Sequence, residues 1–281
     1  GLDITLFADL SSRRQVTAHT AGAVSYIASQ FADTRFLADL RTRGLLPPDD
    51  VPALGSVGLT ATYLALNLRA NAAVPVYVTG LDFSFSPGAT HTRGAPAHTA
   101  RLIAANRLMP AANYDAAFRP GARFVPGKNG TVCTDKALSG YAQQFAGFFG
   151  SAENLFDLGK SGLALGIARA DAIADAPPMA SPRTKTETTY ANNVQQAVDA
   201  FFAQEHAALE RLKALLMYGE RVKSPDMTVR EEIARLLTRR EYLYLHFPDG
   251  YQCTVDDLSF LKRVRSEIDF FLKDIQLAAT R

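Results

Sequence analysis

The sequence predicts an α/β protein in which a mostly parallel sheet domain precedes a segment made only of helices. Three observations carry this prediction. Residues 55–68 open on a glycine–serine turn and continue with apolar residues at helical spacing, and a β-branched run at 74–79 follows. Strand-like and helix-like runs also alternate before residue 55, which indicates parallel strands joined by helical crossovers. Beyond residue 190 the periodicity is only helical.

The first fifty residues are expected to form two strands, each followed by a helical connection or loop. Gly44 ends the second helix, because glycine accepts the left-handed conformation that commonly follows a helix. Two prolines at 47–48 prevent the helix from resuming. The expected strands are 2–10 and 23–28, and the expected helical segments are 13–20 and 33–43.

The run at 74–79 is apolar on both faces, which suits a strand buried in a parallel sheet. In open α/β sheets ligands bind beyond the carboxyl ends of the strands, so Gly80, Asp82 and the following loop are where a ligand is expected. Asp82 suits either contact with a ribose or a metal, or the capping of a turn. Its position in the sequence alone favours the capping role.

The loop at 84–98 carries more polar chemistry than any other loop in the chain. It combines turn-forming glycine and proline with His91, Arg93 and His98. A loop of this length between regular elements is more often functional than filler. A helix at 99–108 follows it.

A strand pair is expected at 123–134, around a Gly-Lys-Asn-Gly turn. An amphipathic helix follows at 135–149, with Thr134 or Asp135 as its N-cap.

The next strand, at 153–158, runs into a glycine-rich loop at 159–166. The Gly-Lys-Ser of this loop is not a Walker A motif, because Asn154 stands where that motif needs its first glycine. A glycine-rich loop at a strand end still lets a ligand approach backbone amides.

Composition shifts to proline and threonine at 176–189, which we interpret as a linker between a sheet domain at 1–175 and helices at 190–281. The helices should pack as a bundle or as a cap on the sheet domain. They are expected at 190–218, 228–245 and 255–277.

The second of these helices carries many charges and aromatic rings. We expect its charged residues on solvated surfaces and its aromatic residues in the core, rather than in a base-stacking platform. The charged residues are Arg230, Glu231, Arg235, Arg239 and Arg240, and the aromatic residues are Tyr242, Tyr244 and Phe247.

Composition narrows the function classes. With 30 Lys and Arg against 28 Asp and Glu, the 281-residue chain has a net charge of +2, which argues against a dedicated nucleic-acid surface. Cys133 and Cys253 lack metal-ligand spacing and are expected to be reduced, partly buried thiols. No apolar run reaches membrane-spanning length and no signal peptide is recognisable, so the sequence predicts a soluble, cytoplasmic protein.

Five short motifs follow one another along the chain between residues 55 and 166. They are Gly55-Ser-Val-x-x-Thr-Ala61, Val78-Thr-Gly-Leu-Asp-Phe83, Thr90-His-Thr-Arg-Gly94, Asn129-Gly-Thr-Val-x-Thr-Asp135 and Gly159-x-Ser-Gly-x-x-x-Gly166. In combination they resemble the 6-hydroxymethylpterin pyrophosphokinase MptE-like family, which includes the central domain of the motility-associated factor (Maf) flagellin glycosyltransferases. The resemblance covers roughly the sheet domain and implies a Rossmann-like fold.

The helix–strand unit and the histidine-bearing loop are also similar to those of Rossmann-like bacterial sialyltransferases. This likeness implies that His91, or His98 as second choice, is a general base, which suits the ordinary pKa of histidine of about 6.5. It also implies that Asp82 contacts the sugar or ribose; the alternative for both histidines is an ordinary loop position. The nucleotide-binding residues implied are Gly55, Ser56, Val57, Thr79, Gly80, Arg93, Gly159, Ser161 and Gly162.

The chain departs from that family in two places. The family begins with a strand and a nucleotide-holding Gly-x-Gly-Pro-Ser-Leu loop, and this chain starts after that point, so the sheet domain is expected to be incomplete at its N-terminus or to lack half of the nucleotide site. Leu54 also stands where the family often has a first glycine. A phosphate can still meet the amides after Gly55 at the helix N-terminus.

Three functions follow from these patterns. The favoured one is transfer of a nonulosonic-acid-like sugar from a nucleotide donor, CMP-linked and needing no metal, to a protein hydroxyl, plausibly of flagellin. The second is an ATP- and Mg²⁺-dependent pterin pyrophosphokinase, whose transferring phosphates require charge neutralisation. The third is a non-catalytic interaction module. The patterns leave the sugar, the acceptor and the oligomeric state open.

Overall fold

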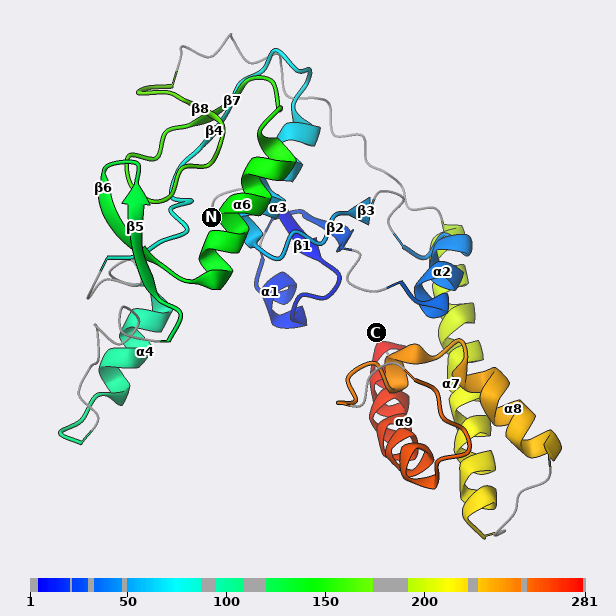
Figure 1. Cartoon of the computed structure of the whole chain (residues 1–281). Coiled ribbons are helices and arrows are strands. Elements are labelled where there is room, and N and C mark those ends of the chain that lie inside the picture. Colours follow the sequence, from blue (N-terminus) through cyan, green and yellow to red (C-terminus); the bar gives the residue numbers. More distant parts are fainter. Residues whose placement is uncertain are drawn as a thin grey trace. The chain divides into compact units, whose positions relative to one another are not determined.

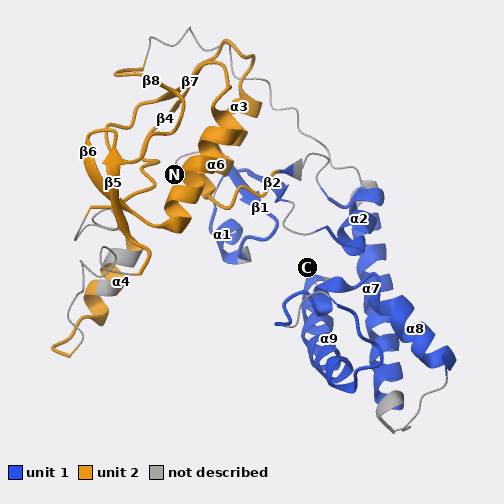
Figure 2. Ribbon diagram, in the orientation of Figure 1, with its two compact units in different colours: residues 1–51, 184–281 blue, residues 52–183 orange. Residues whose placement is uncertain are grey.

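The computed structural model describes residues 5–20, 22–29, 33–46, 50–86, 95–108, 120–173, 192–221, 227–248 and 252–279. It confirms an α/β protein with parallel strands and a C-terminal helical segment. The chain divides into two compact units, residues 1–51 with 184–281 (unit 1) and residues 52–183 (unit 2) (Figure 2). This division differs from the single boundary expected at 176–189, because residues 1–51 group with the C-terminal helices. The expected linker lies outside the described residues.

Unit 1 begins with alternating strands and helices (Figure 1). Its three strands are parallel and are ordered β1-β2-β3. The two longer strands and both helical segments were predicted, whereas β3 is too short for a periodic signal. The elements are β1 (Leu6–Asp9), α1 (Arg14–Ala18), β2 (Val24–Ser29), α2 (Arg35–Thr42) and β3 (Asp50–Val51).

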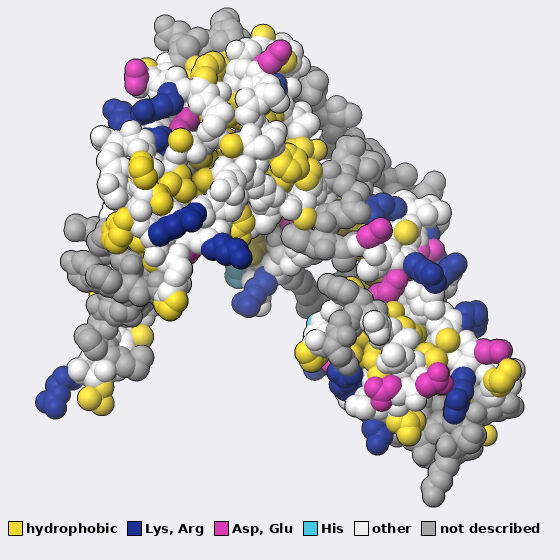
Figure 3. All heavy atoms as spheres, in the orientation of Figure 1, with side chains coloured by type: hydrophobic (Ala, Val, Ile, Leu, Met, Phe, Trp, Pro, Cys, Tyr) yellow, Lys and Arg dark blue, Asp and Glu magenta, His cyan; other side chains and the backbone are white. Residues whose placement is uncertain are grey.

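Helices α7 (Asn192–Arg221), α8 (Met227–Leu237) and α9 (Leu258–Ala279) form the rest of unit 1, with a short 3₁₀ helix η1 (Glu241–Leu243). Helix α7 packs against both α8 and α9. Their apolar faces share a core that includes Leu209, Leu212 and Leu237, all fully buried. Charges of both signs lie interspersed over the face of these helices seen in Figure 3.

The helix expected at 228–245 is wrong in its second half, because α8 ends at Leu237. The Arg240 guanidinium donates to the Leu236 carbonyl, which the end of the helix leaves without an intrahelical partner. The predicted aromatic core is confirmed, since Tyr244 and Phe247 are buried in it and Tyr242 packs against it.

Within unit 1, the N-terminal end of helix α2 contacts the C-terminal segment of the chain. The backbone amides of Arg35 and Phe36 donate to the Glu241 carboxylate at 2.8 and 3.2 Å. The Phe36 ring lies 4.7 Å from the Tyr242 ring, centroid to centroid. These contacts place the first part of the chain with the last.

Unit 2 contains a second parallel sheet, ordered β4-β7-β8, and an antiparallel hairpin of β5 and β6. The hairpin has the predicted place and turn, and Asp135 is the predicted N-cap of α6, accepting from the Leu138 amide. Helix α4 begins at Pro96 rather than Thr99, as suits the favoured position of proline in the first turn. The elements are α3 (Val57–Leu68), β4 (Val76–Val78), α4 (Pro96–Ala104), β5 (Arg123–Gly127), β6 (Gly130–Thr134), α6 (Lys136–Phe149), β7 (Leu155–Asp157) and β8 (Ala168–Arg169).

The core of unit 2 lies around α3, α6 and β7, and contains Leu59, Phe145 and Leu155. Cys133 is buried and Cys253 is exposed, and both are free thiols. Among the helices that the structure describes, none has the length and apolar character needed to cross a membrane.

Candidate functional site at the ends of β4 and β7

Strands β4 and β7 are neighbours and run parallel, with Val78 opposite Asp157. Their carboxyl ends therefore lie at one edge of the sheet. The segment Thr79–Asp82 leaves β4 at this edge, and the glycine-rich segment Gly159–Gly162 leaves β7 there. Two separate stretches that the sequence assigned to nucleotide binding are thus brought to the same place, as expected for ligand sites of parallel sheets.

Asp82 is held between these two loops. Its carbonyl accepts a hydrogen bond of 2.8 Å from the Leu163 amide, and its Oδ1 accepts one of 3.3 Å from the Ser161 hydroxyl. Gly162 has a φ of +86°, and a Cβ there would lie 2.4 Å from the Cα of Asp82. Only glycine permits this approach, so Gly162 is needed to bring the β7 loop against Asp82.

The residue after Asp82 has a strained backbone. Phe83 has a φ of +46°, a conformation rare for a bulky side chain, and it is buried. Its carbonyl accepts a hydrogen bond of 3.0 Å from the buried Thr134 hydroxyl, and the amide of Phe85 donates to the Cys133 carbonyl. Strain of this kind costs roughly 1–3 kcal/mol and is found preferentially at functional sites. Here it fixes the direction in which the chain leaves Asp82.

An ion pair that the sequence did not predict lies beneath the β7 loop. Lys128 Nζ is 2.7 Å from Asp157 Oδ2, and both side chains are only 3% exposed. Asp157 Oδ1 also accepts from the Gly159 amide at 2.8 Å, and the Lys128 amide donates to the Gly162 carbonyl at 2.8 Å. The pair ties the hairpin turn to both ends of the loop.

The start of α3 lies at the same edge. Gly58 packs so closely against Leu81 that a Cβ would come within 2.3 Å of its side chain. This contact places the preceding Gly55, Ser56 and Val57 beside the segment that follows β4. Ser56 is the N-cap residue, yet its side chain makes no capping hydrogen bond. Free amides and the helix dipole at such an end favour an anion.

Thr79 and Gly80 are exposed between these elements, and Gly80 has a φ of +74°. His91 and Arg93 lie outside the described residues, and His98 lies in the first turn of α4 with its side chain outside them. The roles of these three residues therefore stay predictions. Within the described part of the chain, no three His, Cys, Asp or Glu residues lie close enough together to hold a metal ion.

The chain is similar to a protein of Treponema pallidum (strain Nichols) that is described only as uncharacterized. The two are 31% identical over 285 residues, which cover 96% of this chain and 49% of that protein. The chain therefore spans about half the length of the relative it matches. No family model and no solved structure matches the chain.

Proposed function

We propose that the chain acts as a nucleotide-sugar-dependent glycosyltransferase. It would move a nonulosonic-acid-like sugar from a CMP-linked donor to a protein hydroxyl, and we propose flagellin as the protein that carries it. The observation that carries the proposal is the meeting of Asp82 with Ser161 and Gly162, which joins the two loops expected to hold the nucleotide. The resemblance to Maf-type and sialyltransferase motifs supplies the reaction class.

The proposed roles follow from position. The amides after Gly55, with the Ser56 hydroxyl, bind the donor phosphate at the positive end of α3. Asp82 accepts a hydrogen bond from the sugar or ribose, while the loop at 159–162 lets the nucleotide approach its backbone. His91, with His98 as second choice, removes the proton from the acceptor hydroxyl, and Arg93 stabilises the phosphate of the leaving CMP.

Ligand-induced thermal stabilisation tests the nucleotide site. CMP without metal should raise the melting temperature, because a ligand at 100 times its Kd stabilises the folded state by about 2.7 kcal/mol. Ser56→Ala should reduce this shift without lowering the stability of the free protein, since the hydroxyl makes no capping bond. The control is Ser139→Ala, which also removes a serine hydroxyl from unit 2. That hydroxyl is bonded to Arg123 and Lys136, so its loss should leave the CMP-induced shift unchanged.

Two results would contradict the proposal. Stabilisation by ATP with Mg²⁺ but not by CMP would support the pyrophosphokinase, and stabilisation by neither would support an interaction module. The base is tested separately with His91→Ala, which should abolish release of CMP from the sugar donor and leave the CMP-induced shift nearly intact. Loss of both the CMP release and the CMP-induced shift would mean that the loop is structural.

A further inference from the structure

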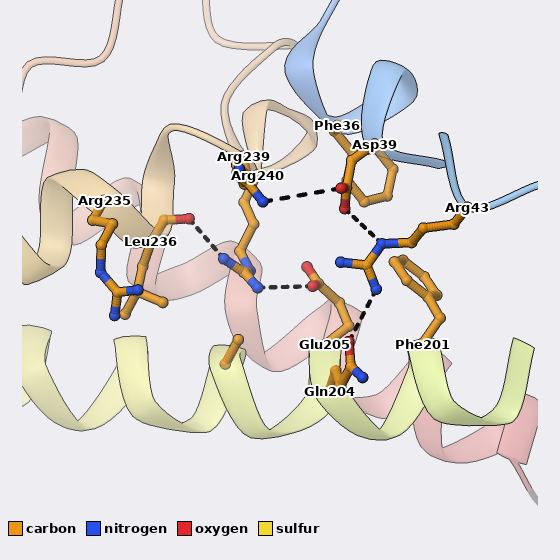
Figure 4. A pocket seen from close by; sticks show the side chains of 11 residues that line it. Phe36, Asp39, Arg43, Phe201, Gln204, Glu205, Arg235, Leu236, Arg239 and Arg240 are labelled. Carbon is orange, nitrogen blue, oxygen red and sulfur yellow. Dashed lines mark hydrogen bonds and ion pairs between the residues drawn. The ribbon is translucent and has the colours of Figure 1, made fainter. Parts of the chain in front are cut away.

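Unit 1 contains a cavity of about 450 Å³ that belongs to none of the elements discussed above as the nucleotide site. Its walls come from α2, α7, the end of α8 and the segment that precedes η1 (Figure 4). Volumes of this order are typical of small-molecule sites. The lining is unusual in its charge, because it includes four arginines, namely Arg43, Arg235, Arg239 and Arg240.

Two of these arginines are held by the protein. Arg240 lies 2.8 Å from Glu205, in an ion pair whose side chains are 12% and 10% exposed. Arg43 pairs with Asp39 at 3.0 Å and donates to Gln204 at 2.9 Å. These pairs use both carboxylates that line the cavity, as the dashed lines of Figure 4 show.

The other two arginines are in excess. Arg239 comes no closer than 3.9 Å to Asp39, whose other oxygen is held by Arg43. Arg235 interacts through its charge with Glu232 of α8, but that carboxylate is already held by two hydrogen bonds from Arg211. Four guanidinium groups against two carboxylates leave the cavity lining with a net charge of +2.

A buried donor adds to this imbalance. The Nε atom of Arg240 is buried, and it has no acceptor among the residues that the structure describes. Buried polar groups in proteins nearly always have a partner, so this unpaired donor adds positive character to the cavity wall, although it is too buried for a ligand to contact directly.

One wall of the cavity is aromatic. The rings of Phe36 and Phe201 lie 6.2 Å apart, and the Arg43 guanidinium stands 5.8 Å from the centre of the Phe201 ring. The cavity therefore offers an apolar surface beside a surplus of forked donors. Guanidinium groups match the oxygens of phosphate in paired hydrogen bonds, which a single ammonium cannot do.

We propose that this cavity binds a small organic phosphate, with its dianionic group among the arginines of the lining and its apolar or aromatic body against Phe36 and Phe201. The site is separate from the nucleotide site of unit 2 and does not depend on the proposed transferase activity. The charge of a phosphate monoester balances the net charge of the lining.

Calorimetric titration of the full chain with phenyl phosphate, and in parallel with inorganic phosphate, tests the proposal. Phenyl phosphate should bind saturably and more tightly than inorganic phosphate, because only the ester uses the aromatic wall. The double variant Arg235→Gln/Arg239→Gln should weaken its binding by about tenfold or more, since it removes the surplus positive charge of the lining. Arg235→Lys/Arg239→Lys should recover the affinity only in part.

The matched control is Lys262→Gln/Lys273→Gln, which removes the same charge from exposed positions of α9 and should change the affinity less than twofold. Equal weakening by both double glutamine variants would overturn the site, because it would mean attraction to the overall charge. Equal affinity for phenyl phosphate and inorganic phosphate would overturn the organic ligand. Absence of saturable binding would overturn both the site and the organic ligand. Binding of an acidic peptide, with no binding of phenyl phosphate, would replace the proposal with a protein partner.

Discussion

At the scale of single residues, the sequence located the loops of the candidate site but not the pair that holds them. Asp82, Ser161 and Gly162 could be selected because strand ends and glycine-rich turns are visible in sequence. Lys128 and Asp157 are 29 residues apart, on a hairpin turn and on a parallel strand. No local pattern predicts that two such elements meet, so the ion pair became visible only in three dimensions.

This pair gives the first prediction for stability. Lys128→Met should destabilise unit 2 by roughly 3–5 kcal/mol, because it leaves the Asp157 carboxylate buried without its counter-charge. The control Lys136→Met removes an exposed lysine of the same unit and should change stability by no more than about 0.5 kcal/mol. Urea unfolding measures both. Similar stability of the two variants would show that water reaches Asp157 and that the pair is not buried in solution.

At the scale of elements, periodicity predicted most of the helices and strands with small errors at their ends. It failed where tertiary contacts decide, as at the end of α8. The segment 228–245 reads as one amphipathic helix, yet the chain breaks after Leu237, and Arg240 and Tyr242 both reach Glu205 of α7. Arg240 was expected on a solvated face and is largely buried instead. Its partner lies 35 residues away, which a helical pattern cannot encode.

The same cluster predicts a dependence on alkaline pH. Burial, followed by the nearby Glu205 carboxylate, raises the pKa of Tyr242 far above its ordinary value, and Arg240 opposes this only in part. The neutral hydroxyl that donates to Glu205 is therefore favoured by folding. Its contribution to stability is complete below the unfolded pKa of about 10 and declines as the pH rises above it.

Tyr242→Phe isolates this contribution. At pH 8 the variant should be less stable than the wild type by about 1–3 kcal/mol, because Glu205 loses a buried donor. Above pH 10 the difference should shrink, since only the wild type then has a hydroxyl that unfolding allows to ionise. Urea unfolding at several pH values measures both proteins, and the raised pKa of Tyr244 affects the two alike. A constant difference across this range would mean that the Tyr242 hydroxyl is solvated in the folded state.

At the scale of the whole molecule, the sequence predicted the α/β class but not the grouping of its parts. Composition marked a change at 176–189, and this suggested a domain that ends there. It could not show that residues 1–51 group with the C-terminal helices. That grouping depends on individual contacts, such as the Glu241 carboxylate at the start of α2 and the Phe36 ring against Tyr242. Each of these contacts joins residues about two hundred positions apart.

The last prediction concerns unit 1, which combines two separate stretches of the chain. A chain lacking residues 1–51 removes Phe36 from the Tyr242 ring and leaves the Glu241 carboxylate without the α2 amides. Burial of one phenylalanine side chain alone stabilises a fold by about 1.5–3 kcal/mol, so the helices at 192–279 should unfold at lower temperature than in the full chain. Unit 2 keeps its own core around Phe145 and should retain its hydrogen-exchange protection. Hydrogen exchange followed by mass spectrometry reports the two units separately. Loss of protection in α6 and β7, with α7 and α9 unchanged, would show that residues 1–51 stabilise the other unit.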